Sequence, residues 1–141
     1  MRVFLDTSAL AKRYVAEPGT QTVMELCDQA DTLMISVIAV PEMISAFFRL
    51  RRERHITSRQ YTSLKQFFLS DITDALICET TPEVIQSAVN LLERYSLRGM
   101  DAIHLGAAQV SQADVFVSAD ARQCQACERL GIEVVNLSAS T

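Results

Sequence analysis

The 141-residue sequence predicts an α/β fold: a three-layer α/β/α arrangement in which helices cover both faces of a mostly parallel central sheet. Two observations predict it. Short apolar segments alternate along the chain with longer segments whose apolar residues recur at helical spacing. Hydrophobic residues make up 49% of the chain, which is enough for a substantial core at this length. We therefore expect a single domain over residues 1–137, followed by a short tail at 138–141.

The first half of the chain contains two expected strands and four expected helices. An apolar run at 3–5 ends at an acid, and Pro18-Gly19 terminates the helix that follows it. Apolar residues gather on one face of the later helices, and Thr57 or Ser58 can cap the last of them. In order, the expected elements are a strand at 3–5, helices at 7–15 and 20–29, a strand at 33–37, a helix at 40–54, and a helix from Thr57 or Ser58 to about residue 72.

The second half continues the alternation. A weaker strand candidate covers 75–78, and Thr81-Pro82-Glu83 then combines a hydroxyl cap, a proline at the first helical position and an acid in the first turn. Gly99 is expected to break the chain before a helix at 101–112. The remaining expected elements are a strand at 115–117, a helix at 119–130 that Gly131 ends, and a strand at 133–135.

Composition and charge exclude several classes of protein. The chain carries 13 Lys and Arg against 17 Asp and Glu, a net charge of −4, and its apolar content is too high for a disordered chain. The longest nearly apolar stretch, 33–40, is far shorter than the ~20 residues of a membrane-spanning helix, and Asp6 falls where a signal peptide would still be apolar. We expect a soluble, cytoplasmic protein with no membrane partner and with reduced cysteines.

Four acids fall at junctions between an expected strand and the next helix, or at a helix start: Asp6, Glu42, Asp101 and Asp120. Each one alone reads as a helix cap. Together they would converge beyond the carboxyl ends of parallel strands, where ligands bind in such sheets. Clustered carboxylates repel one another unless a divalent cation neutralises them, and oxygen ligands without His or Cys favour Mg²⁺ or Mn²⁺. Metal-dependent hydrolysis of phosphodiester bonds is the chemistry that these residues suggest.

The sequence also resembles the PIN-domain ribonucleases, and among them the VapC-type toxins of prokaryotic toxin–antitoxin pairs. The matching segments are 3–10 (VFLDTSAL), 40–46 (VPEMISA), 97–108 (LRGMDAIHLGAA), 115–120 (VFVSAD) and 131–136 (GIEVVN). The resemblance implies an α/β/α nuclease domain, Mg²⁺ or Mn²⁺ held by the four acids, endonucleolytic cleavage of RNA, a homodimer, and neutralisation by a cognate antitoxin. Many members have Thr-x-Asp where this chain has Ser118-Ala119-Asp120, and Pro41 is uncommon before Glu42.

On this interpretation, Asp6, Asp101 and Asp120 are the closest metal ligands, and Glu42 either binds the metal or positions the attacking water. The hydroxyls of Thr7 and Ser118 are expected to orient carboxylates. Pro41 is expected at the first helical position, where it is harmless.

Other residues allow more than one interpretation. Residues 49–65 include six bases and one acid. The first four of these bases are arginines that could bind RNA phosphates, form a solvated helix face, or contact a second subunit or antitoxin. They are Arg49, Arg51, Arg52 and Arg54. His104 could donate to a ligand or phosphate, but packing or a structural hydrogen bond is the preferred interpretation. We expect Cys124 and Cys127 to be structural thiols, and the doublets at 47–48 and 67–68 to be core or dimer-interface residues.

Two other functions compete with the ribonuclease. A non-catalytic RNA-binding or regulatory PIN domain would usually lack some ligands, whereas all four acids are present here. A phosphatase or receiver-like domain would use Asp6 as a covalent phosphate acceptor, but Asp6-Thr7-Ser8 lacks a second acid two residues on, and no lysine lies in the carboxyl-terminal half.

Overall fold

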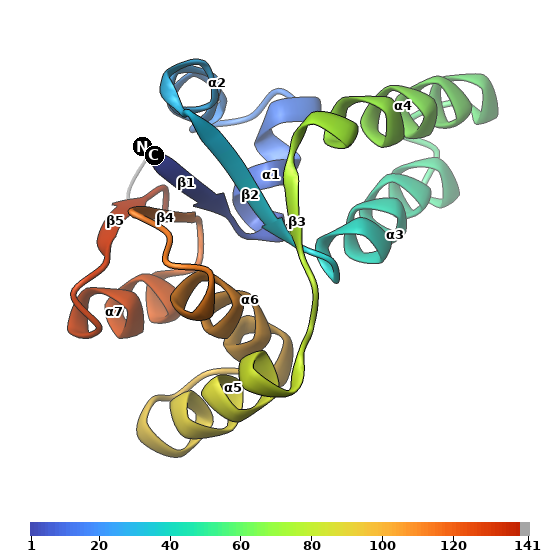
Figure 1. Ribbon diagram of the computed structural model, residues 1–141. Coiled ribbons are helices and arrows are strands. Elements are labelled where there is room, and N and C mark those ends of the chain that lie inside the picture. Colours follow the sequence, from blue (N-terminus) through green and yellow to red (C-terminus); the bar gives the residue numbers. More distant parts are fainter. Residues whose placement is uncertain (139–141) are drawn as a thin grey trace.

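A computed structural model describes residues 1–138 and has five parallel strands in one sheet (Figure 1). The order across the sheet is β3-β2-β1-β4-β5. The strands are β1 (Arg2–Leu5), β2 (Thr32–Ser36), β3 (Leu76–Cys78), β4 (Val115–Ser118) and β5 (Glu133–Asn136). All four pairings are parallel. The predicted α/β fold with a parallel central sheet is therefore confirmed.

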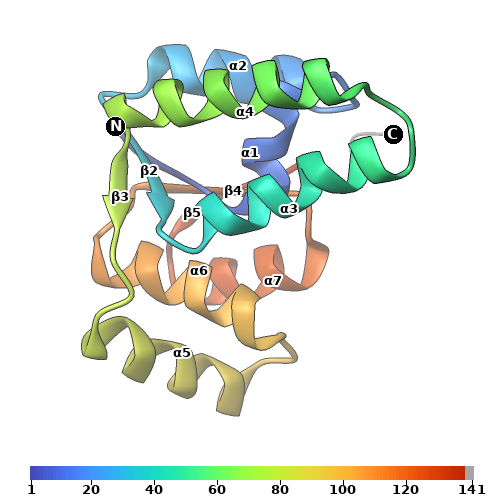
Figure 2. The same ribbon diagram turned by 90° about the vertical axis from the view of Figure 1, so that its right-hand side faces the viewer.

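Helices cover both faces of this sheet, as Figures 1 and 2 show. They are α1 (Thr7–Tyr14), α2 (Thr20–Gln29), α3 (Ala39–Arg52), α4 (Ser58–Asp71), α5 (Pro82–Arg94), α6 (Gly99–Val110) and α7 (Ala121–Arg129), with a 3-10 turn at Ile72–Asp74. Helices α1 to α4 pack on one face, and α5 to α7 pack on the other. Within residues 1–138, none of these helices is long and apolar enough to cross a membrane.

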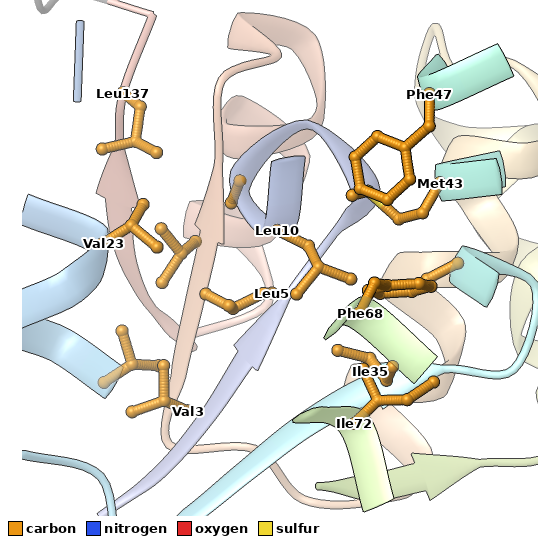
Figure 3. Close-up of a cluster of buried hydrophobic side chains, with 14 residues drawn as sticks. Val3, Leu5, Leu10, Val23, Ile35, Met43, Phe47, Phe68, Ile72 and Leu137 are labelled. Atoms are coloured by element: carbon orange, nitrogen blue, oxygen red, sulfur yellow. The ribbon is translucent and has the colours of Figure 1, made fainter. Parts of the chain in front are cut away.

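Alternating side chains of the central strands supply the two cores. Val3 and Leu5 of β1 point into the core beneath α1 to α4, whereas Phe4 points into the core beneath α5 to α7, because successive side chains of a strand face opposite ways. Figure 3 shows the first of these cores, where Phe47, Met43 and Phe68 lie on one side of Leu10 and Leu5 lies on the other. The central strands β1 and β4 are buried on both faces, which explains why their side chains are almost entirely apolar.

The order of the strands places a crevice beside β1. The chain runs outward from β1 to β2 and β3, then returns to the other side of β1 to form β4 and β5. In doubly wound sheets, ligands bind outside the carboxyl ends of the strands at the point where the order reverses. Here that point lies between β1 and β4, which end at Leu5 and Ser118.

Several boundaries differ from the sequence-based expectation. Helix α6 begins at Gly99 and ends at Val110, so the glycine starts the helix that it was expected to precede. Pro41 is the third residue of α3 rather than the first, although its missing N–H is still one of the four that a helix start leaves free. Ile72 lies in a 3-10 turn after α4. Of the expected tail, Ser138 donates its backbone N–H to Asn136, and residues 139–141 lie outside the described part of the chain.

Candidate active site

A cavity of about 190 Å³ opens at the carboxyl ends of β1 and β4. It is lined by Asp6, Thr7, Ser8, Glu42, Asp101, His104 and Asp120. The side chains come from four separate segments: the β1–α1 junction, α3, α6 and the β4–α7 junction. The structure thus brings together all four acids singled out in the sequence, which are spread over more than a hundred positions.

Asp6 is the most deeply buried of the four acids. Its side chain caps α1 by accepting from the backbone N–H of Ala9 at 2.9 Å, and it also accepts from the hydroxyls of Ser8 at 2.7 Å and Ser118 at 2.6 Å. The residue is only 4% exposed. Burial raises the pKa of Asp6, and the three hydrogen bonds oppose that rise only in part. A positive ligand in the cavity would favour its ionised form.

Asp101 and Asp120 stand at the starts of the two helices on the other side of the cavity. Asp120 caps α7 and accepts from the backbone N–H groups of Arg122 and Gln123 at 2.9 and 3.3 Å. Asp101 lies in the first turn of α6 and accepts from the backbone N–H of Arg98 at 3.3 Å. Burial raises the pKa of Asp101, and the negative charge of Asp120 raises it further. The two carboxylates therefore repel each other across the cavity.

Glu42 is held by a histidine and a threonine. Its Oε1 atom lies 2.7 Å from His104 Nε2 and accepts from Thr7 Oγ1 at 2.6 Å. The hydrogen bond with His104 is the largest influence on the pKa of Glu42; burial opposes it, but with the bond from Thr7 the pKa is lowered overall. Glu42 is thus the acid of the cavity that is kept ionised by its own hydrogen bonds.

His104 is buried, with 3% of its surface exposed, and it also lines the cavity. Its hydrogen bond with Glu42 agrees with the preferred interpretation of packing or a structural hydrogen bond, and the structure adds that the partner is one of the four acids. Its Nδ1 atom has no hydrogen-bond partner within residues 1–138, so its contacts with protein oxygens run through Nε2. The available signal was its position three residues after Asp101, which puts both side chains on one side of α6.

Ser118 and Gln123 connect the carboxylates behind the cavity. The Ser118 hydroxyl donates to Asp6 and accepts from the backbone N–H of Asp120 at 2.9 Å. Gln123, which is fully buried, donates through Nε2 to the backbone oxygen of Asp101 at 2.8 Å. Both Thr7 and Ser118 therefore donate to a carboxylate of the cavity. The sequence indicated those two hydroxyls, but nothing in it indicated Gln123.

The donor set suits a hard divalent cation that keeps part of its water shell. Within residues 1–138, no three His, Cys, Asp or Glu side chains stand close enough together to enclose an ion as they are. Mg²⁺ usually keeps several waters and binds proteins through one or two carboxylates. Four carboxylates around a single small cavity, with the charge of Asp120 raising the pKa of Asp101, fit that mode of binding better than a closed cage.

The arginines of α3 lie at the end of the helix away from the cavity. Arg51 is nine positions beyond Glu42, about 14 Å along a helix. Its guanidinium donates to Ser58 Oγ at 3.0 Å and lies over the Phe48 ring. Arg51, Arg52 and Arg54 line a separate, open cavity of about 540 Å³ at the α3–α4 turn. The structure does not bring this cluster to the acids.

The remaining candidates take structural positions. Cys124 and Cys127 are buried, unpaired thiols, and burial raises the pKa of each to about 12, so neither is a reactive thiolate. Each phenylalanine doublet is split between core and surface: Phe47 and Phe68 are buried, whereas Phe48 and Phe67 are 40% and 60% exposed.

Fold and site together define a doubly wound α/β protein with an acid-lined crevice at its topological switch point. The sequence profile of the PIN domain family matches residues 3–129, and the chain belongs to this family. Two curated relatives from Mycobacterium tuberculosis, Ribonuclease VapC45 and Ribonuclease VapC49, are each 29% identical over 106 residues, which cover 75% of this chain and 74% of theirs.

Solved structures share the fold at lower sequence identity. The M. tuberculosis toxin VapC20, described as cleaving the sarcin-ricin loop, aligns with a TM-score of 0.67 and 18% identity, covering 95% of this chain and 98% of its own. FitAcB from Neisseria gonorrhoeae gives 0.73 and 14%, with coverage of 97% and 99%. VapBC2 from Rickettsia felis, solved with a DNA fragment from its promoter, gives 0.69 and 15%, with coverage of 96% and 98%.

Proposed function

We propose that this protein is a Mg²⁺- or Mn²⁺-dependent endoribonuclease that acts as the toxin of a toxin–antitoxin pair. One observation carries the proposal: Asp6, Glu42, Asp101 and Asp120, which are far apart in the sequence, line a single cavity at the topological switch point of a PIN domain. Such a cluster is costly without a cation, and a cation beside a phosphodiester is what its hydrolysis needs.

The comparisons support the substrate and the partner. The curated relatives bear the name ribonuclease, and one structural neighbour is described as a toxin that cleaves the sarcin-ricin loop. Another is a toxin–antitoxin complex from Klebsiella pneumoniae, with a TM-score of 0.66 and 16% identity. By similarity to these proteins, we infer RNA as substrate and a cognate antitoxin as partner. The resemblance of the sequence to VapC-type toxins further implies that the antitoxin blocks the cavity and that the protein is a homodimer.

Each side chain of the cavity has a role in this proposal. When bound, the metal supplies a nucleophilic water and neutralises charge that develops on the phosphate. Asp6, Asp101 and Asp120 would hold it, one or two of them directly and the rest through its bound water. Glu42, which is ionised and held through Oε1, would accept a proton from the attacking water through Oε2, for which no hydrogen bond is found within residues 1–138. Thr7 and Ser118 keep the carboxylates oriented, so that little rearrangement is needed on binding.

Cleavage of a labelled RNA under metal titration tests the proposal. We expect activity with Mg²⁺ or Mn²⁺, none in EDTA, and loss of activity in Asp6→Asn and Asp101→Asn. The matched control is Asp28→Asn, which removes the same charge from an exposed position at the end of α2. That helix end leads into the start of β2, at the opposite edge of the sheet from the cavity.

Three results would contradict the proposal. Full cleavage by both cavity variants would mean that the site is assigned wrongly. RNA binding without cleavage at any metal concentration would favour a non-catalytic PIN domain, and a phosphorylated Asp6 would favour the phosphotransfer alternative. Mapping the RNA ends after induction of the protein in cells would then identify the target, and co-expression with a small open reading frame beside its gene would test neutralisation.

A further inference from the structure

A second polar cavity, of about 360 Å³, lies outside the acid-lined site and contains no acid. It is lined by Arg94, Tyr95, Ser96, Arg122, Gln125, Ala126 and Arg129. The end of α5 and the residues that follow it form one wall, and α7 forms the other. Figure 2 shows that the chain leaving α5 turns toward α6 on the side of the molecule where α7 lies.

The wall formed by α7 is a single face of that helix. Its four lining residues lie at positions 122, 125, 126 and 129, the spacing that puts side chains on one side of a helix. Helix α7 starts at the acid-lined cavity, because its cap is Asp120 and the backbone N–H of Arg122 donates to the Asp120 carboxylate at 2.9 Å. The arginine-lined cavity therefore extends along α7, away from the proposed catalytic acids, over about 10 Å between Arg122 and Arg129.

The concentration of positive charge here is unusual for this part of the chain. Residues 71–141 contain only four basic side chains among ten acidic ones, and three of the four line this cavity. Within residues 1–138, none of the guanidinium groups of Arg94, Arg122 and Arg129 is found in a hydrogen bond or an ion pair; the recorded bonds of Arg122 involve its backbone. Three like charges around one hollow repel one another, and an anion held between them removes that cost.

We propose that this cavity binds phosphate groups of the RNA strand next to the bond that is cut. Guanidinium groups bind phosphate through paired hydrogen bonds. The half-buried ring of Tyr95 offers a surface on which a base of the same strand can stack. The inference rests on the proposed ribonuclease function, because it assigns part of the substrate-binding surface for that reaction.

The hydrogen bond from the backbone of Arg122 to Asp120 favours this cavity, rather than the α3–α4 turn, as the site that positions the substrate. A phosphate held beside Arg122 would lie two positions along α7 from Asp120, whereas Arg52 ends α3 and Arg54 lies in the turn after it, at the far end of that helix from Glu42. An acidic segment of a protein partner could also pair with arginines, and the experiment below separates the two.

The test compares two double variants that remove the same charge. Arg94→Gln/Arg129→Gln removes two of the three arginines of the proposed site and keeps Arg122 beside Asp120. Arg52→Gln/Arg54→Gln is the matched control at the α3–α4 turn. Binding of a fluorescently labelled single-stranded RNA is measured by anisotropy in EDTA, which prevents cleavage, over a range of salt concentrations. Loss of two phosphate contacts should reduce the slope of log K against log[salt] by about 1.4 for single-stranded RNA. With Mg²⁺ present, KM for RNA cleavage should rise in the same variant.

The salt dependence of RNA binding in the two double variants decides whether the cavity binds RNA phosphates. A larger fall in slope for Arg94→Gln/Arg129→Gln than for the control supports the site. An equal or smaller fall would overturn it, because the effect would then be one of net charge alone. The proposal would also be overturned if Arg94→Gln/Arg129→Gln lost binding to a hexaglutamate peptide but kept its binding to RNA. Because RNA binding is measured without metal, the comparison of the two double variants does not depend on cleavage. If the chain never cleaved RNA, the proposed function would be wrong, but the binding comparison would still test the site.

Discussion

Replacement of His104 should loosen Glu42 and lower stability together with activity. The His104 imidazole lies 2.7 Å from Glu42 Oε1, and apart from it only Thr7 is found donating to that carboxylate within residues 1–138. In His104→Leu, a side chain of similar bulk fills the space but has no donor. In His104→Gln, an amide N–H stands at about the position of the lost ring nitrogen, so this variant is the matched control.

The size of the effect follows from the contacts. A hydrogen bond to a charged group contributes about 1.5–3 kcal/mol, and the lower end applies because the Glu42 side chain is 31% exposed. For a chain of this length, about 1.5–2 kcal/mol corresponds to a fall in Tm of roughly 6–8 °C. Loss of a residue that orients a catalytic carboxylate typically costs about 10–100-fold in activity. The pKa of Glu42 should also rise, because its largest lowering influence is gone.

Thermal unfolding, RNA cleavage and NMR titration of the Glu42 carboxyl measure these three effects. His104→Gln should recover part of each. If His104→Leu unfolded at the wild-type temperature and kept the wild-type pKa of Glu42, the hydrogen bond would not be holding the carboxylate, and the reasoning would be wrong. A stability loss shared equally by the glutamine variant would mean that the ring packs rather than positions.

Further predictions concern the acids of the cavity, the contact between α5 and α6, and the core. Burial raises the pKa of Asp6 and Asp101, so the folded chain binds protons there more tightly than the unfolded chain. In EDTA, the stability that this tighter proton binding contributes should be lost as the pH rises from 3.8 through the raised pKa values of the folded chain, and Tm should fall with it. Asp101→Asn should make this fall in Tm smaller. An unchanged dependence of Tm on pH in the variant would contradict the raised pKa of Asp101. Gly106→Ala would put a Cβ atom 3.1 Å from a backbone oxygen of α5 and should lower Tm, whereas Gly99→Ala, with nothing within 4 Å, should leave it unchanged or raise it slightly. Calorimetry of the pair checks this, and equal Tm values would refute the close contact. Phe68→Ala removes a fully buried ring and should cost about 3–5 kcal/mol in urea unfolding; a loss below about 1 kcal/mol would be inconsistent with its burial.

Most of the fold was accessible from local patterns. Burial on both faces requires apolar side chains on the central strands, and this property is visible in single segments such as residues 3–5 and 115–117. Thr81 caps α5 with its side chain as its local sequence predicted, and of the two candidates for the cap of α4, Thr57 and Ser58, the structure selects Thr57. The exceptions are helix ends, where a difference of one or two residues depends on tertiary contacts rather than on propensity.

The site was accessible only in part. An acid placed directly after a strand marks the ligand-binding edge of the sheet, which is why Asp6 and Asp120 could be found. Gln123 could not, because its role depends on an oxygen of α6 that lies 22 positions away in the sequence. The arginine-lined cavity was also missed, since Arg94 belongs to a different helix from Arg122 and Arg129.

The sequence by itself determined the order of helices and strands and the edge of the sheet at which the acids stand, because periodicity and caps are local properties. Only the tertiary structure decided how the charges are distributed around that edge. It turned His104 onto Glu42, joined Asp101 and Asp120 in one cavity, and gathered three of the four arginines of the acidic half beside it. The reason is physical: repulsion and hydrogen bonding depend on distances of a few ångströms between side chains, which the packing of helices on the sheet sets.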